Sequence, residues 1–231
     1  MKVQAQESSS KASLIVIDGA DNAGKATQTA LLKERLLHEG KKVETMDFPQ
    51  YTQNTFGRLI KECLAGQHGD FLTIDPKIAS TLYAADRFES KERLLKLLAE
   101  NDIVLLDRYV SANMLHQGAK ILNEGERHDF LSWLNHIEYG IFGMPKPDLT
   151  IFLSLSAQHS DEIHQAIIED GEKIPDIAEV NREHQRQVAS CLLWLSTMQN
   201  NWVTLHCSQE GKLRSKDNIH KEIYNCVIEQ M

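Results

Sequence analysis

The segment LIVIDGADNAGK, residues 14–25, carries the most informative pattern in the chain. Its first four residues, Leu14 to Ile17, form a short apolar and β-branched run, which is typical of a strand buried on both faces. The next part, Gly19 to Lys25, fits the GxxxxGK pattern of a phosphate-binding loop. From Lys25 to His38 apolar residues recur at helical spacing, which predicts a helix. A strand, a glycine loop and a helix in this order are the context that the motif requires.

The phosphate-binding loop combines three sources of positive potential. Its glycines let backbone N–H groups turn toward a phosphate, the following helix presents its positive N-terminal end, and Lys25 adds a full charge. A glycine turn before an ordinary helix is the alternative, and the strand and helix on either side argue against it. We therefore expect nucleotide contacts from Gly19, Asn22, Ala23, Gly24, Lys25, Ala26 and Thr27.

Ala26 departs from the motif, because the residue after the lysine is normally Ser or Thr, whose hydroxyl binds Mg²⁺. Alanine has no side-chain oxygen for a metal, and Thr27 is turned away by about 100° around a helix. Two interpretations stay open. Either the metal is held through water and nucleotide oxygens, or the site is a weakened ATPase site.

Strand and helix patterns alternate along the rest of the chain. Strands are predicted at 43–48, 103–106, 149–155 and 202–207, and helices at about 54–65, 76–100, 126–141, 180–199 and 216–230. The alternation implies crossover connections, and hence an α/β fold with a parallel sheet and helices on both faces. No repeat or linker divides the chain, so we expect one domain at 13–231 after a disordered polar tail at 1–12.

Composition narrows the possible partners and the location. Lys and Arg number 25 against 33 Asp and Glu, which gives a formal net charge of −8 and a pI near 5.7. This acidic balance disfavours nucleic acid and anionic membranes as partners. No apolar run approaches the roughly 20 residues that a bilayer-spanning helix needs. The four cysteines are far apart, as expected for reduced thiols, and the predicted location is the cytoplasm.

Several segments together resemble the thymidylate kinases of the P-loop nucleoside monophosphate kinase group. They are the loop at 18–28, DFPQY at 47–51, LYAADR at 82–87, DRY at 107–109 with Ser111, Asn113, Gln117 and Gly118, and PDLT at 147–150. The resemblance implies ATP-dependent phosphorylation of dTMP to dTDP, with Mg²⁺ as cofactor. It also implies a three-layer P-loop NTPase fold with a five-stranded parallel sheet flanked by helices, a short lid at about 157–181, and a homodimer.

The resemblance assigns the catalytic centre to Lys25, Asp21, Arg108 and Asp107. Asp21 and Asp107 would lie near the metal, and Arg108 would bind the acceptor phosphate. A bidentate guanidinium matches a phosphate better than an ammonium group does. The attacking phosphate oxygen is already anionic near neutral pH, so alignment and charge neutralisation are expected to dominate catalysis rather than a general base.

The acceptor base would lie between the rings of Phe48 and Tyr83, with Arg87 hydrogen-bonded to its edge. The alternative for both rings is an ordinary place in the hydrophobic core. His116 stands where relatives often have tyrosine, which bears on selectivity for the deoxy sugar. The predicted acceptor-binding residues are Asp21, Phe48, Tyr51, Tyr83, Arg87, Arg108, Asn113, His116 and Gln117.

The chain lacks the arginine that family members usually bring to the transferred phosphoryl group, either at the position of Asn22 or from the lid. Between 157 and 181, Lys173 is the only Lys or Arg among seven acidic residues. Arg182 could replace the missing arginine, and the alternative is that Arg182 and Arg186 both face solvent. Ala26 and the acidic lid leave open a catalytically weakened nucleotide-binding protein on the same fold. Because Arg87 by itself does not distinguish thymine from uracil, a kinase for another pyrimidine monophosphate such as dUMP also stays open.

Overall fold

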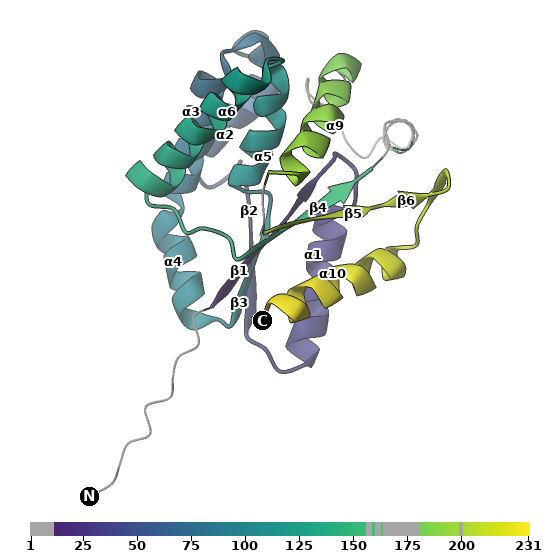
Figure 1. Cartoon of the computed structure of the whole chain (residues 1–231). Coiled ribbons are helices and arrows are strands. Elements are labelled where there is room, and N and C mark those ends of the chain that lie inside the picture. The colour runs from purple at the N-terminus through teal and green to yellow at the C-terminus, as the bar shows by residue number, and fades with distance from the viewer. Residues whose placement is uncertain (1–11, 156–158, 160–162, 164–180, 199–200) are drawn as a thin grey trace, which may run out of the picture.

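The computed structural model describes residues 12–155, 159, 163, 181–198 and 201–231. They form a central sheet with helices packed on both sides (Figure 1). The predicted tail at 1–12 and lid at 157–181 lie almost wholly outside the described residues and stay predictions. Of the described helices, none has both the length and the apolar composition needed to cross a bilayer.

Five parallel strands form the sheet in the order β2-β3-β1-β4-β5. They are β1 (Ser13–Gly19), β2 (Val43–Asp47), β3 (Ile103–Asp107), β4 (Leu149–Ser154) and β5 (Trp202–His206), and a short antiparallel pair follows, β6 (Ser208–Gln209) with β7 (Lys212–Leu213). The predicted five-stranded parallel sheet is confirmed. Because the strands share one direction, the residues that follow β1 and β3 meet at the same edge, where open α/β sheets bind ligands.

The helices cover the two faces unequally (Figure 1). One face carries α1 (Lys25–His38) and α10 (Lys216–Gln230), and the other carries α4 (Lys91–Glu100), α5 (Val110–His116), α6 (Glu124–Asn135) and α9 (Arg182–Ser196). Two further helices, α2 (Thr55–Leu64) and α3 (Pro76–Glu89), pack against each other beside this second layer. Short 3₁₀ segments lie at Phe71–Thr73 and Gly118–Lys120, and a π-helix at His136–Ile141.

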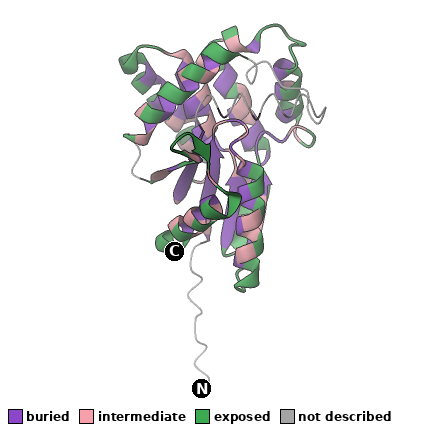
Figure 2. Ribbon diagram, turned by 90° about the vertical axis from the view of Figure 1, so that its right-hand side faces the viewer, coloured by how far each residue is buried: buried purple, intermediate pink, exposed green. Residues whose placement is uncertain are grey.

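The central strands are buried on both faces, as Figure 2 shows. Side chains alternate along each strand, so Val16 and Leu106 pack in the cluster under α4, α5 and α9. Their neighbours Ile17 and Leu105 pack in the cluster under α1 and α10. A strand with a hydrophobic cluster on each side has no polar face, which explains why the sequence shows a continuous apolar run there.

The helix predicted at 76–100 is wrong as a single element, because it divides into α3 and α4 at Ser90. The Ser90 hydroxyl accepts a hydrogen bond from Asn54 Nδ2 at 2.8 Å, and its backbone N–H donates to the Arg87 carbonyl. Helical periodicity continues through the break, so the sequence pattern could not locate it. The short helix α5 was not predicted either, since seven residues carry too little periodicity.

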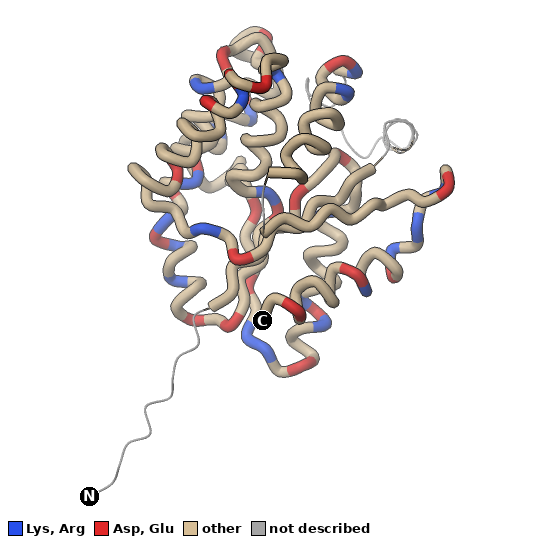
Figure 3. Tube along the Cα trace, viewed as in Figure 1, with Lys and Arg blue, Asp and Glu red and all other residues tan. Residues whose placement is uncertain are grey.

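Charged side chains of both signs occur along α10 (Figure 3). The basic residues just before it lie in or beside a short hairpin. Lys212 lies in β7, and Arg214 Nη2 forms an ion pair with Glu222 Oε1 at 2.6 Å. This pair ties the β6–β7 hairpin to α10 and explains the clustering of charge there.

Candidate active site

The phosphate-binding loop lies between β1 and α1 and is tightly packed against β4. Gly19 has φ 134°, and a Cβ there would lie 2.2 Å from the carbonyl oxygen of Leu153, so only glycine fits. Asn22 and Gly24 also adopt left-handed backbone conformations, with φ 60° and 82°. The Ala20 N–H donates to the Leu153 carbonyl at 3.0 Å, which anchors the loop to the sheet.

Lys25 is buried at the first turn of α1, with its Nζ turned back into the loop. Nζ donates to the carbonyl of Ala20 at 2.7 Å and to that of Gly19 at 3.3 Å. Burial and the nearby Arg108 lower the Lys25 pKa, and three carboxylates offset part of that effect. Ala26 and Thr27 are exposed on the outer side of the same turn.

Arg108 and Asp21 join the phosphate loop to the region beyond β3. Arg108 follows β3 with φ 65°, and its Nη2 donates to Asp21 Oδ1 at 2.7 Å. The second oxygen, Oδ2, accepts from Gln185 Nε2 at 3.2 Å, so α9 also reaches this carboxylate. Burial alone would raise the Asp21 pKa, but Arg108, with smaller contributions from His116, Lys25 and the Gln185 hydrogen bond, holds that pKa well below the usual range. Both groups are therefore charged at neutral pH.

Two more carboxylates lie at the same edge of the sheet. Asp18 is fully buried and accepts the Gly19 N–H at 2.9 Å and the Ser111 hydroxyl at 2.5 Å, so it supports the loop from behind. Asp107 ends β3, and its carboxylate accepts no hydrogen bond from the part of the chain that the structure describes, which leaves the carboxylate oxygens available. Burial raises the pKa of both acids. Within the described residues, no three His, Cys, Asp or Glu side chains are grouped closely enough to hold a metal ion alone.

A cavity of about 690 Å³, counting the space at its mouth, opens beside Asp21 and Arg108. All nine predicted acceptor-binding residues line it, namely Asp21, Phe48, Tyr51, Tyr83, Arg87, Arg108, Asn113, His116 and Gln117. The fold thus brings together residues from the loop and from α3, α5 and the ends of β2 and β3.

Aromatic rings form much of the cavity wall. Phe48 and Tyr109 contact each other with ring centroids 5.7 Å apart, and Phe71 and Tyr83 do so at 6.1 Å. Phe48 and Tyr83 also belong to hydrophobic clusters, so the core role and the cavity role apply together. Phe71 and Tyr109 also line the cavity and were not predicted there. Phe71 lies in no motif, and the DRY segment at 107–109 indicated no role for its tyrosine.

Polar groups at the inner end of the cavity have fixed orientations. Arg87 Nη2 donates to Asn113 Oδ1 at 3.2 Å. Because arginine can only donate, the amide oxygen of Asn113 must face Arg87, and its Nδ2 donor faces away from Arg87. Asn113 Nδ2 and Gln117 Oε1 are buried and have no hydrogen-bond partner among the described residues. Buried polar atoms are normally paired, so an unpaired donor and an unpaired acceptor in a cavity wall indicate a polar ligand.

The thymidylate kinase family model matches residues 17–223 of this chain. The chain belongs to the thymidylate kinase family. The thymidylate kinase of Mycobacterium tuberculosis (strain ATCC 25618 / H37Rv) is 36% identical over 149 residues, covering 64% of this chain and 69% of that protein. The probable thymidylate kinase of Thermococcus onnurineus is 36% identical over 151 residues, covering 63% and 68%. The solved structure of the Candida albicans thymidylate kinase shares the fold, with a TM-score of 0.69, 24% identity and coverage of 95% and 92%.

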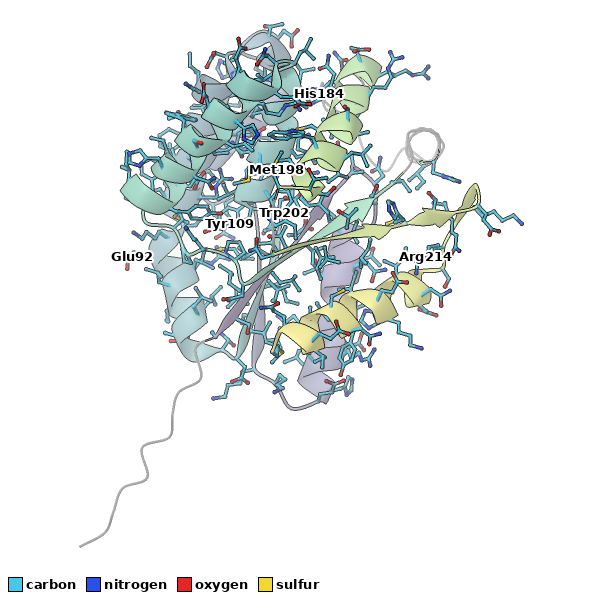
Figure 4. The ribbon with its side chains drawn as sticks, in the orientation of Figure 1. Glu92, Tyr109, His184, Met198, Trp202 and Arg214 are labelled. Atoms are coloured by element: carbon cyan, nitrogen blue, oxygen red, sulfur yellow. The ribbon has the colours of Figure 1, made fainter. Side chains whose placement is uncertain are left out.

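Two histidines meet in the cavity of this thymidylate kinase family member. His184 extends from α9 (Figure 4), and its ring stacks on His116 of α5 with centroids 6.0 Å apart. Burial lowers the His116 pKa to about 3, with Arg108 adding to the effect and Asp21 opposing it. His116 is therefore a neutral imidazole at physiological pH. His184 was missed because nothing in its local sequence separates it from the other nine histidines.

Other residues of this thymidylate kinase family member lie near the site without having been predicted there. Lys120 lines the cavity and donates to the carbonyls of Phe71 and Ile74, both at 3.3 Å. Burial lowers its pKa to about 8. Arg182 and Arg186 are exposed, yet both line a second hollow that also contains Ala20 of the phosphate loop. The two interpretations of Arg182, solvent-facing or turned to the phosphates, are thus compatible with its position.

Proposed function

We propose that the protein transfers the γ-phosphoryl group of ATP to dTMP, giving ADP and dTDP. The observation that carries the proposal is the Arg108–Asp21 pair, which joins the phosphate-binding loop to a cavity lined with aromatic rings. A donor phosphate on the loop and an acceptor phosphate on Arg108 would then be neighbours. Membership of the thymidylate kinase family supports the same reaction.

The hydrogen-bonding groups of the cavity favour thymine or uracil over cytosine. Arg87 can only donate, Asn113 offers its Nδ2 donor, and Gln117 offers its Oε1 acceptor. Thymine and uracil present two carbonyl oxygens and one ring N–H along this edge. Cytosine presents an amino group in place of one carbonyl, and its ring nitrogen there has no hydrogen. A site with this donor and acceptor set leaves cytosine with unpaired buried groups, which weakens binding.

Residues of the chain align the donor and acceptor phosphates and neutralise their charge. We propose that the N–H groups of the loop and Lys25 bind the donor phosphates, while Arg108 holds the acceptor phosphate for in-line attack. The attacking oxygen is anionic, so no residue needs to remove a proton. His116, neutral and half-buried, lines the cavity with a polar ring rather than a charge.

The site also fits Mg²⁺, provided that the nucleotide supplies part of the ligand set. We propose Asp107, whose oxygens are available, and Asp21 as the protein carboxylates that hold the ion. One or two carboxylates with water and phosphate oxygens are a common magnesium environment. When bound, the ion neutralises charge on the β- and γ-phosphates. This proposal favours a metal held without Ala26 over a weakened ATPase site.

A second candidate function rests on the position of Ala26. Its exposed methyl group stands where the motif has a metal-binding hydroxyl, which favours a nucleotide-binding protein with weak catalysis. Changing Ala26 to Ser separates the two candidates. A large gain in rate would indicate a handicapped site, whereas an unchanged rate would show that the metal is already placed by other groups.

The deciding experiment measures ADP release from Mg-ATP by the purified protein with dTMP, dUMP, dCMP, UMP and GMP as acceptors. We expect turnover with dTMP, less with dCMP, and none in the Lys25→Ala control. Background rates with every acceptor, together with retained nucleotide binding, would instead favour the binding protein. Preference for dUMP over dTMP would reassign the acceptor within the same enzyme class.

We also propose a homodimer, supported by apolar side chains exposed on the π-helix and the end of α3. Ile141 is 59% exposed and Phe88 is 49% exposed, and the Phe88 ring contacts that of Phe142 with centroids 4.9 Å apart. Exposed apolar groups that gather in this way often mark an interface. Sedimentation equilibrium of the wild type and of Phe88→Glu tests it, and a monomeric wild type would contradict it. The cytoplasmic location stays a prediction, which fractionation of the source cells would test.

A further inference from the structure

Glu138 is a carboxylate with no exposed surface, and it lies on the π-helix outside every predicted site residue. Its Oε1 accepts from Arg87 Nε at 3.0 Å and also from Arg87 Nη2. Its Oε2 has no hydrogen-bond partner among the residues that the structure describes. Burying an ionised carboxylate is costly unless it is paired, so the placement of Glu138 is understandable only through Arg87.

A count of the Arg87 donors shows what this pairing leaves for a ligand. A guanidinium has five N–H groups in a rigid plane. Nε–H and one Nη2–H bind Glu138, the other Nη2–H binds Asn113 Oδ1, and one Nη1–H points to the Tyr109 carbonyl at 3.4 Å. One N–H of Nη1 remains unused. The guanidinium is therefore held along one edge and can offer a single donor to the cavity.

The charges of the Arg87–Glu138 pair also favour an uncharged base as the ligand. Burial alone would lower the Arg87 pKa, but the ion pair with Glu138 raises that pKa above its usual value, so Arg87 stays charged beside the Glu138 carboxylate. Together they are neutral, and an uncharged base can lie beside them without meeting a bare cation. Without the Glu138 charge, Arg87 would attract water or anions into the inner end of the cavity.

We infer that Glu138 is a positioning residue for acceptor selection: it holds Arg87 so that one N–H donor faces a carbonyl oxygen of the acceptor base. The inference rests on the proposed function, because it takes Arg87 as the group that contacts the base. It concerns the acceptor and leaves the ATP site unaffected, since the pair lies on α3 and the π-helix rather than on the phosphate loop.

The test compares wild type, Glu138→Gln, Arg87→Met and the double variant Arg87→Met/Glu138→Gln. Glutamine keeps the shape of the side chain and removes its charge. We expect Glu138→Gln to weaken dTMP binding and raise the KM for dTMP about tenfold or more, with the KM for ATP changed by less than about twofold. The preference for dTMP over dCMP should fall as well, because a loosened guanidinium no longer requires a carbonyl. In the Arg87→Met background, Glu138→Gln should add no further loss.

The matched control is His136→Gln, which alters an exposed residue at the start of the same π-helix. It should leave both KM values unchanged. If Glu138→Gln fails to fold, Glu138→Asp serves instead, since it keeps the charge but draws the carboxylate back from Arg87; the same selective loss for dTMP is expected.

Two results would overturn the inference. One is a lower Tm for Glu138→Gln with unchanged dTMP affinity and unchanged discrimination against dCMP, which would make the pair purely structural. The other is a loss that is equally large in the Arg87→Met background, which would show that Glu138 does not act through Arg87. Failure of the proposed function is distinct from both, because the wild type itself would then bind ATP and neither bind nor phosphorylate dTMP.

Discussion

Arg108 lies in the left-handed region of the backbone at φ 65°, which disfavours any residue other than glycine by roughly 1 kcal/mol. The conformation turns its side chain toward Asp21 and the cavity. The strained backbone and the partly buried ion pair thus act together to fix a phosphate-binding group.

Replacing Arg108 with Lys should lower kcat for dTMP by about 100-fold, because an ammonium cannot bind a phosphate and Asp21 in the planar geometry of a guanidinium. The KM for ATP should change little. Steady-state kinetics with each substrate varied measures both values. Arg58→Lys, at an exposed arginine of α2, is the control and should behave as wild type. Equal kcat values for Arg108→Lys and wild type would contradict the proposed role.

At the scale of elements, the phosphate loop and β4 behave as one unit, since Gly19 packs directly on the Leu153 backbone. Changing Gly19 to Ala should destabilise the fold by roughly 3 kcal/mol or more, because the added methyl group meets a carbonyl oxygen in addition to an unfavourable φ. Urea unfolding measures the loss. Gly40→Ala is the matched control: it has φ 81° and open space around the new methyl group, so about 1 kcal/mol is expected. Equal losses in the two variants would show that the contact with β4 is unimportant.

Elements formed by local patterns were predictable, and elements formed by distant contacts were not. The strand, loop and helix at 13–38 follow from apolar spacing and glycine positions. The break at Ser90 depends on Asn54, a residue of another element, so no local pattern reveals it. The candidate site divides in the same way. Residues within family motifs were placed in advance, whereas Gln185 and Glu138 reach the site from α9 and the π-helix, which carry no motif.

At the scale of the whole molecule, the half-buried His116 should make stability depend on pH. In the unfolded chain a histidine titrates near 6.5, whereas the folded protein lowers the His116 pKa to about 3. Between pH 6.5 and pH 3, His116 is therefore protonated in the unfolded state but not in the folded state. Stability falls as pH decreases from 6.5 toward 3.

The variant His116→Gln should remove this part of the pH dependence. Between about pH 7 and pH 5, the wild type should lose on the order of 2 kcal/mol more unfolding free energy than the variant. Urea unfolding at both pH values measures it. His38→Gln, at an exposed histidine of α1, should retain the wild-type slope. Parallel curves for wild type and His116→Gln would contradict the expectation.

The Asp21 carboxylate accepts a hydrogen bond from Arg108 through one oxygen and from Gln185 through the other. This arrangement affects how two nucleotides bind to the protein at the same time. A phosphate that draws Arg108 away from Asp21 alters the charge that the phosphate loop presents to a second ligand. We therefore expect donor and acceptor to bind cooperatively rather than independently. If the donor changes the affinity for the acceptor by a given factor, the acceptor must change the affinity for the donor by the same factor, because binding linkage is reciprocal.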